Sequence, residues 1–149
     1  MELLKLAALD TEDLTVISAH LQDAILRPED LTYLAGEQRF LMVVRRFDWT
    51  PDVPPRRRLA GVHFERVLRV KTRGLAPGDA MPMSLLALTF TPTDTPSGLI
   101  DLVFSGGAAV RLEVECIEVR MKDLGPVWEA ATRPGHDVDR PDAPPGTAA

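Results

Sequence analysis

The feature that most constrains this chain is an alternation of apolar and polar residues that recurs along most of its length. Its clearest instance is residues 109–122, where apolar side chains take every second position from Val110 to Val114. Successive side chains of a β-strand point to opposite faces, so this pattern predicts a half-buried strand. The phase slips at Cys116–Ile117, which predicts a bulge that bends the strand. A helix beginning near residue 113 is the alternative, because short apolar runs are ambiguous.

Other segments carry the same alternation and are predicted to be strands. In one of them the alternation fails near Glu65–Arg66, which predicts a second bulge. In another, Leu86, Leu88 and Phe90 are expected on one face of the sheet. The proline-rich residues 48–58 are expected to form a loop rather than a central strand. The predicted strands are 31–35, 39–47, 58–74, 84–91 and 98–104, with tight turns at 36–38, 76–79 and 105–109.

One segment near the start has the period of a helix instead. Apolar residues recur at spacings of three and four from Leu14 to Ile25, which predicts a helix over residues 10–26. The carboxylate of Asp10 can accept a hydrogen bond from a free amide of the first turn, so Asp10 is the expected N-cap. Pro28 is expected to end the helix, because proline disfavours helical geometry in the residue before it.

Together these segments predict an α+β fold. We expect a bent antiparallel sheet of about six or seven strands, with one N-terminal helix packed on it. A barrel-like closure and a pleckstrin-homology-like arrangement are the alternatives, although folds of the latter kind end in a helix. The length of 149 residues predicts one domain. We place it at residues 1–131, and we expect the proline-rich residues 132–149 to form a mobile tail.

Composition favours a cytoplasmic protein. The single cysteine excludes an internal disulfide and is typical of a reducing compartment. No apolar run reaches the roughly 18–20 residues that a membrane helix needs, so no membrane association is expected. The first residues, MELLKLAALDTED, lack the features of a signal peptide.

The charges are distributed unevenly along the chain. The formal net charge is -5, yet residues 39–73 hold ten of the 17 basic side chains and only three acidic ones. Such a basic stretch can orient an anionic partner, and it can equally keep an exposed strand face soluble. An anion-binding or nucleic-acid-binding role for residues 39–73 is therefore one hypothesis, which the overall acidity of the chain weakens.

Trp49 begins the most distinctive loop. It precedes a proline-stiffened segment and three consecutive arginines, and tryptophan and arginine are enriched at interface hot spots. The other interpretation is that Trp49 folds back over the open end of the sheet, and Trp128 has the same ambiguity. The candidate interaction surface comprises Trp49, Arg56, Arg57, Arg58, Arg66, Arg69 and Arg73.

The pattern of chemistry-bearing residues does not favour catalysis. The three histidines lie far apart in the sequence, and Cys116 lies within a predicted strand, so we expect no metal, no cofactor and no catalytic residue. We therefore expect a non-catalytic binding module with a protein partner, and a homodimer through a strand edge is also open. A small enzyme is the remaining alternative, with Glu113 and Glu115 facing a site in the mouth of the sheet.

Two longer stretches resemble a known family. They are FDW followed by RRLAGVHFERVLRVKTRGL, and GGAAVRLEVECIEVRMKDLGPVW. Both resemble the DUF2948 family, an uncharacterised bacterial family associated with alphaproteobacteria. The resemblance extends from residue 1 to about residue 137. It implies no activity, cofactor or catalytic residue for this chain.

Overall fold

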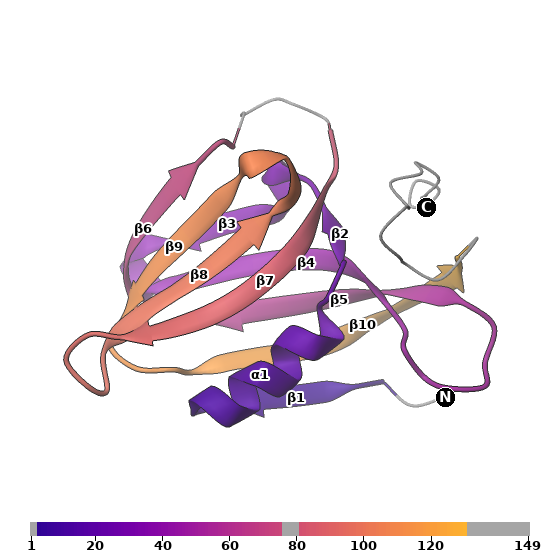
Figure 1. The fold of residues 1–149 in the computed structure, drawn as a ribbon, viewed down its shortest axis with the longest axis horizontal. Coiled ribbons are helices and arrows are strands. Elements are labelled where there is room, and N and C mark those ends of the chain that lie inside the picture. Colours follow the sequence, from indigo (N-terminus) through magenta and orange to yellow (C-terminus); the bar gives the residue numbers. More distant parts are fainter. Residues whose placement is uncertain (1–2, 76–80, 131–149) are drawn as a thin grey trace.

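The computed structural model describes residues 3–75 and 81–130, which form one α-helix, ten strands and three short 3-10 helices at Pro28–Asp30, Ala35–Glu37 and Ser105–Gly107. Figure 1 shows how the α-helix and the strands are arranged. The turn predicted at 76–79 and the tail predicted at 132–149 lie outside these residues. The elements are β1 (Lys5–Ala8), α1 (Thr11–His20), β2 (Ile25–Leu26), β3 (Leu31–Leu34), β4 (Arg39–Phe47), β5 (Arg56–Phe64), β6 (Val67–Arg73), β7 (Met83–Pro92), β8 (Gly98–Phe104), β9 (Ala109–Val114) and β10 (Val119–Glu129).

The ten strands form one strongly bent sheet. Its order is β1-β10-β5-β4-β2-β7-β8-β9-β6, with β3 paired to β4 outside this path, and the pairings are antiparallel. The order has two ends, β1 and β6, so the sheet is not a closed barrel. The predicted number of strands was too low for two reasons. Short strands such as the two-residue β2 carry too little alternation to detect, and two predicted long strands are each divided by a bend.

Both predicted bends are confirmed, and they lie side by side. β5 passes into β6 at Glu65–Arg66, where the φ of Arg66 is +58°. β9 passes into β10 through residues 115–118. Two backbone hydrogen bonds join the bends, from the Glu65 N–H to the Glu118 carbonyl (2.9 Å) and from the Glu115 N–H to the Arg66 carbonyl (3.1 Å). The paired strands therefore turn together from one part of the sheet to the other. Residues 109–122 form two strands joined by the bend at 115–118, and not a helix.

The helix is shorter than its sequence pattern predicts. Its N-cap is confirmed, because the Asp10 carboxylate accepts the Asp13 N–H at 2.8 Å. It ends at His20 and not at residue 26, since the following residues pair with β7 instead. The Asp23 N–H donates to the Leu85 carbonyl (3.0 Å), and the Leu85 N–H donates to the Ala24 carbonyl (2.9 Å). Pairing with the sheet satisfies these backbone groups, so the apolar pattern continues as strand β2.

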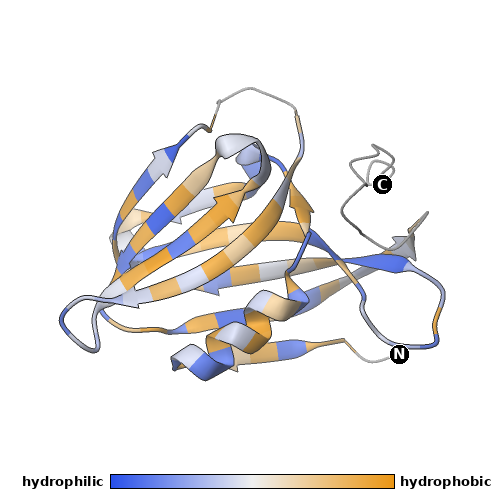
Figure 2. Cartoon of the chain, in the orientation of Figure 1, coloured by the Kyte–Doolittle hydropathy of each residue, from blue (hydrophilic) through white to orange (hydrophobic). Residues whose placement is uncertain are grey.

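The core lies inside the bend of the sheet and under α1, which buries Leu14 and Ile17 (Figure 2). Most of the inward positions that the strand alternation predicts are confirmed. Val110, Leu112 and Val114, for example, are all buried. Leu86 is an exception. It is exposed while Leu85 is buried, because a bulge between Leu85 and Ala87 shifts the register of β7 against β8. The turn at Ser105–Gly107 joins two strands, as predicted.

Within residues 3–75 and 81–130, no helix is long and apolar enough to cross a membrane.

Candidate functional site

The inward face of β4 changes character along the strand. Phe40, Met42 and Val44 are buried in the apolar core. The next side chains on the same face are Arg46 and Asp48, because alternate residues of a strand share a face. Both are also buried, each with 4% of its surface exposed. The interior of the sheet is therefore apolar at one end and charged at the other.

The neighbouring strands repeat this change. On β5 the buried apolar face that ends at Ala60 continues with Arg58 and then Arg56. On β10 the face of Met121 continues with Asp123. Since β10, β5 and β4 are adjacent in the sheet, their charged ends meet in one cluster.

The best-buried part of this cluster is a bidentate ion pair between β4 and β10. Arg46 Nε lies 2.8 Å from Asp123 Oδ1, and Arg46 Nη2 lies 2.9 Å from Asp123 Oδ2. The two side chains are 4% and 1% exposed. Asp123 also accepts the backbone N–H of Leu4 at 3.0 Å, so the pair fixes the segment that leads into β1.

Asp48 is the centre of the second part. Its Oδ2 accepts hydrogen bonds from Arg56 Nε (2.7 Å) and Arg58 Nε (2.8 Å). Its Oδ1 accepts the Thr50 hydroxyl (2.5 Å) and the Thr50 N–H (3.0 Å). This set of contacts holds the two arginines of β5 against the loop that follows β4.

Both carboxylates are held in their ionised form. Burial alone would raise the pKa of Asp48, but hydrogen bonds from Thr50, Arg58 and Arg56 outweigh it and hold that pKa far below its ordinary value. Burial also acts to raise the pKa of Asp123. There the hydrogen bonds from Arg46 and the Leu4 N–H, together with the charges of Arg46 and Arg58, lower it.

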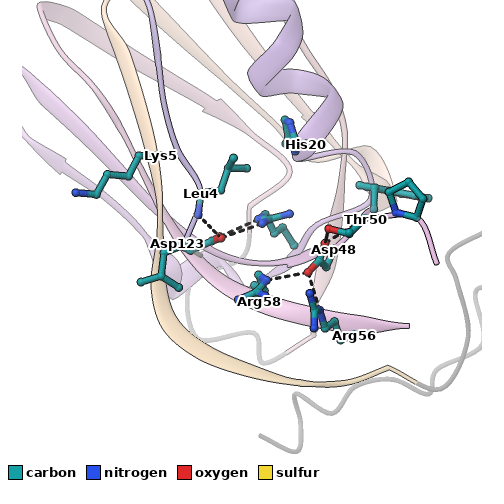
Figure 3. Close-up of a pocket in the computed structure, with 12 residues that line it drawn as sticks. Leu4, Lys5, His20, Asp48, Thr50, Arg56, Arg58 and Asp123 are labelled. Carbon is teal, nitrogen blue, oxygen red and sulfur yellow. Dashed lines mark hydrogen bonds and ion pairs between the residues drawn. The ribbon is translucent and has the colours of Figure 1, made fainter. Parts of the chain in front are cut away.

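The cluster forms one side of a pocket of about 920 Å³ (Figure 3). The pocket lies between the segment leading into β1, the C-terminal end of α1, the loop after β4 and the charged ends of β5 and β10. Its lining residues are Leu3, Leu4, Lys5, His20, Arg46, Asp48, Trp49, Thr50, Pro51, Arg56, Arg58 and Asp123. Figure 3 shows His20 reaching the pocket from the end of α1, opposite the Asp48 cluster.

His20 is biased toward its neutral form. Burial and the nearby charge of Arg46 lower its pKa, while Asp123 and Asp48 act in the opposite direction. The net effect places its pKa below the ordinary histidine value of about 6.5. The imidazole at this wall of the pocket is therefore mostly uncharged at neutral pH.

The pocket carries a surplus of positive charge. Three arginines line it, Arg46, Arg56 and Arg58, against the two carboxylates of Asp48 and Asp123. Lys5 belongs to the lining too, but Figure 3 shows its side chain pointing away from Asp48 and Arg56. Arg56 bonds to Asp48 through Nε, and its two terminal nitrogens have no hydrogen-bond partner among the residues that the structure describes. Lys5 likewise forms no ion pair with any described residue.

Part of the predicted interaction surface lies at this pocket. Trp49, Arg56 and Arg58 line it, but the arginines are not in a loop, since Arg56–Arg58 are the first residues of β5. Arg57 is buried on the other face, 5.8 Å above the Phe47 ring, and its Nη1 donates to the Arg45 carbonyl at 2.9 Å. The loop was predicted from its prolines, but the last of them is Pro55 and strand β5 begins at the next residue.

The two tryptophans lie near the same end of the sheet. The Trp49 ring meets Phe47 edge-on, with 4.6 Å between ring centroids. Trp128 lies in β10, opposite Arg57 of β5. The position of Trp49 therefore corresponds to the interpretation in which this residue folds back on the sheet.

The remaining predicted residues lie elsewhere. Arg66 is at the bend and contacts Glu118 at 3.2 Å, Arg69 of β6 contacts Glu113 at 3.0 Å, and Arg73 ends β6. None of these three arginines lines the pocket, so the structure does not bring the seven candidates together. That Arg66, Arg69 and Arg73 contact a binding partner stays a prediction. Glu113 and Glu115, considered for an enzyme, are both exposed, pair with Arg69 and Arg66, and do not line the pocket.

Several pocket residues were missed by reasoning from the sequence, namely Lys5, His20, Arg46, Asp48 and Asp123. A signal for two of them was present, because the alternation of Phe40, Met42 and Val44 extends without interruption through Arg46 to Asp48. Asp123 follows Met121 in the same way. No group of three or more histidine, cysteine, aspartate or glutamate residues in the described part of the chain is arranged to hold a metal ion.

Comparisons with known proteins bear on the family and on nothing further. Neither the curated proteins nor the solved structures gave a significant match. One family model does match, that of DUF2948, described as a protein of unknown function, and it covers residues 4–136. These residues include every described strand as well as the pocket from Leu4 to Asp123. The chain therefore belongs to the DUF2948 family.

Proposed function

We propose that this protein is a non-catalytic binding module and that its ligand is a small anionic molecule held in the pocket between β1, α1 and the loop after β4. The observation that carries the proposal is the surplus of basic side chains around a pocket of about 920 Å³. That volume is in the range of small-molecule sites.

The two carboxylates support this function by positioning the arginines. Asp48 holds Arg56 and Arg58, and Asp123 holds Arg46, so these side chains need little further ordering when a ligand enters. Preorganised groups of this kind bind more tightly because less conformational entropy is lost. The planar end of Arg56 can donate two parallel hydrogen bonds, which fit a carboxylate or phosphate.

Apolar lining residues would contact the remainder of the ligand. Leu3, Leu4 and Pro51 contribute aliphatic surface, and Trp49 contributes an aromatic ring. A ligand with a compact acidic group and a short apolar part satisfies both kinds of wall. The protein-partner, homodimer and cytoplasmic hypotheses derived from the sequence stay predictions beside this one.

The test is calorimetric titration of the protein with phosphate, sulfate and citrate, and with a neutral sugar as a control. We expect anions to bind and Arg56→Gln to weaken binding about tenfold, since a hydrogen bond to a charged group contributes about 1.5–3 kcal/mol. Lys71→Gln is the matched control, because Lys71 is an exposed basic residue of β6 that does not line the pocket.

Two results would overturn the proposal. One is the absence of binding by all three anions, and the other is an Arg56→Gln variant that binds like the unmodified protein. Binding should also weaken at high salt, because a partly open basic pocket is screened.

A further inference from the structure

A second hollow lies next to the first, on the outer face of β1, β10 and β5. Its volume is about 350 Å³. All four of its ionisable lining residues can carry positive charge, namely Lys5, His63, Arg120 and Lys122. No acidic side chain lines it among the residues that the structure describes.

The positive charges in this hollow are poorly neutralised. Lys5 of β1 and Lys122 of β10 are direct register partners in the sheet. Like charges directly opposite each other on neighbouring strands are destabilising. Neither lysine forms an ion pair within the described part of the chain, and Arg120 has only a 3.7 Å contact with Glu118. His63 is the exception, since its Nδ1 lies 2.6 Å from Glu65 Oε2.

The two hollows adjoin at one residue. Lys5 belongs to the lining of both, and β1 is an end strand of the sheet, so the inward-facing pocket and the outward-facing hollow meet at the edge that β1 forms. A ligand with a single acidic group can neutralise the basic residues on only one side of this edge. Two linked anionic groups would neutralise both, and the second would bind at a high effective concentration once the first is held.

We propose that the ligand is a linear oligophosphate, with one phosphate group at Arg56 in the first pocket, another at Lys122 and Arg120 in the second hollow, and Lys5 between them. This inference rests on the proposed anion binding in the first pocket and specifies the class of anion. A phosphate chain without bases is favoured over a nucleic acid because the second hollow has no aromatic lining residue except His63, whose ring nitrogen already contacts Glu65. Base-stacking platforms are the usual companions of single-strand binding.

The experiment compares inorganic phosphate, tripolyphosphate and a longer linear polyphosphate by calorimetric titration at constant ionic strength. We expect the longest chain to bind at least about tenfold more tightly than inorganic phosphate. Lys122→Gln and Arg120→Gln should each reduce polyphosphate affinity several-fold and leave phosphate affinity unchanged. Arg56→Gln should reduce both, and Lys71→Gln, which removes an equal charge outside both hollows, should change neither.

Loss of folding is separated from loss of binding by urea denaturation. Because Lys122 faces Lys5, removal of its charge should leave the urea midpoint unchanged or raise it. Polyphosphate affinity that is equal to phosphate affinity, or insensitive to Lys122→Gln and Arg120→Gln, overturns the inference while the proposed function stands. A single-stranded oligonucleotide that binds more tightly than polyphosphate of equal charge overturns the ligand class. Absence of binding by phosphate and polyphosphate alike removes this inference, and it removes the proposed function too if sulfate and citrate also fail.

Discussion

The inward faces of β4, β5 and β10 are apolar at one end and charged at the other, although the side chains at both ends are buried. At one end Met42 and Val62 are buried among apolar neighbours. At the other end Arg46 and Asp123 are buried to a similar degree as an ion pair. Strand geometry decides which side chains point inward, and residue type then decides whether that position is core or pocket wall. Burial alone therefore does not separate a stabilising residue from a candidate functional one.

Breaking the buried ion pair should have the largest effect on stability. Asp123→Ala leaves the Arg46 guanidinium buried without its carboxylate, and an uncompensated buried charge of this kind costs about 4 kcal/mol. We expect that loss in the free energy of unfolding, measured by urea denaturation. The double variant Arg46→Met with Asp123→Leu should recover most of it, since an apolar pair needs no neutralisation. A single variant that loses less than about 1 kcal/mol would show that water reaches Arg46 freely.

Removing an apolar side chain from the other end should cost somewhat less. Met42→Ala deletes a fully buried side chain, and the cavity it leaves should lower the free energy of unfolding by about 3 kcal/mol. Its anion affinity should be unchanged, because Met42 does not line the pocket. Weakened anion binding in this variant would show that the two ends are mechanically coupled.

An exposed ion pair of the same geometry makes the comparison sharper. Arg111 and Asp101 are also bidentate, at 2.7 and 3.1 Å, but they lie on the outer face of β9 and β8. Exposed pairs are hydrated and screened, so Asp101→Ala should not measurably shift the urea midpoint. A shift comparable to that of Asp123→Ala would mean that geometry, and not burial, sets the contribution of these pairs.

The smallest effect concerns pH. The pKa of His20 is lowered in the folded state, so the unfolded state binds more protons below the ordinary histidine pKa of about 6.5. Stability should therefore decline slightly as the pH falls from about 6.5 toward 5, and His20→Gln should flatten this part of the profile. The measurement is the urea midpoint as a function of pH.

The carboxylates act in a separate pH range. Because the folded-state pKa values of Asp48 and Asp123 are lowered, their contribution is complete above the ordinary aspartate value of about 3.9 and is lost as the pH falls below it. His20→Gln should leave this steeper decline in place. If His20→Gln removed both declines in stability, the ionisation of Asp48 and Asp123 would depend on His20.

The sequence predicted the parts of the fold that depend on local alternation. The inward row of Val110 to Val114 and the bends at residues 65–66 and 115–118 were found because period and phase are visible in the residues themselves. The end of α1 at His20 was not, since pairing with β7 depends on a segment more than sixty residues away. The bulge at Leu86 escaped prediction for a similar reason, because it is defined only against β8.

The candidate site was predicted less well than the fold. Trp49, Arg56 and Arg58 were recognised as candidates, but Arg46, Asp48 and Asp123 at the ends of the inward rows were not. Arginine and aspartate are seldom buried, so composition argues against placing Arg46 and Asp123 inside. Only their pairing across β5, which the sequence does not reveal, makes that placement favourable.

The pairing of β1 with β10 has a consequence for the order in which the molecule is assembled. The hydrogen bond between Leu4 and Asp123 joins residues 119 positions apart, and Arg46 lies 77 positions before Asp123. During synthesis the ribosome releases β1 and β4 long before β10. Arg46 therefore has no ion pair with Asp123 until nearly all the described strands have been synthesised. Contacts of such long range also slow folding. The wall of the pocket that Asp123 forms is therefore complete only after β10 has been synthesised and has paired with β1 and β5.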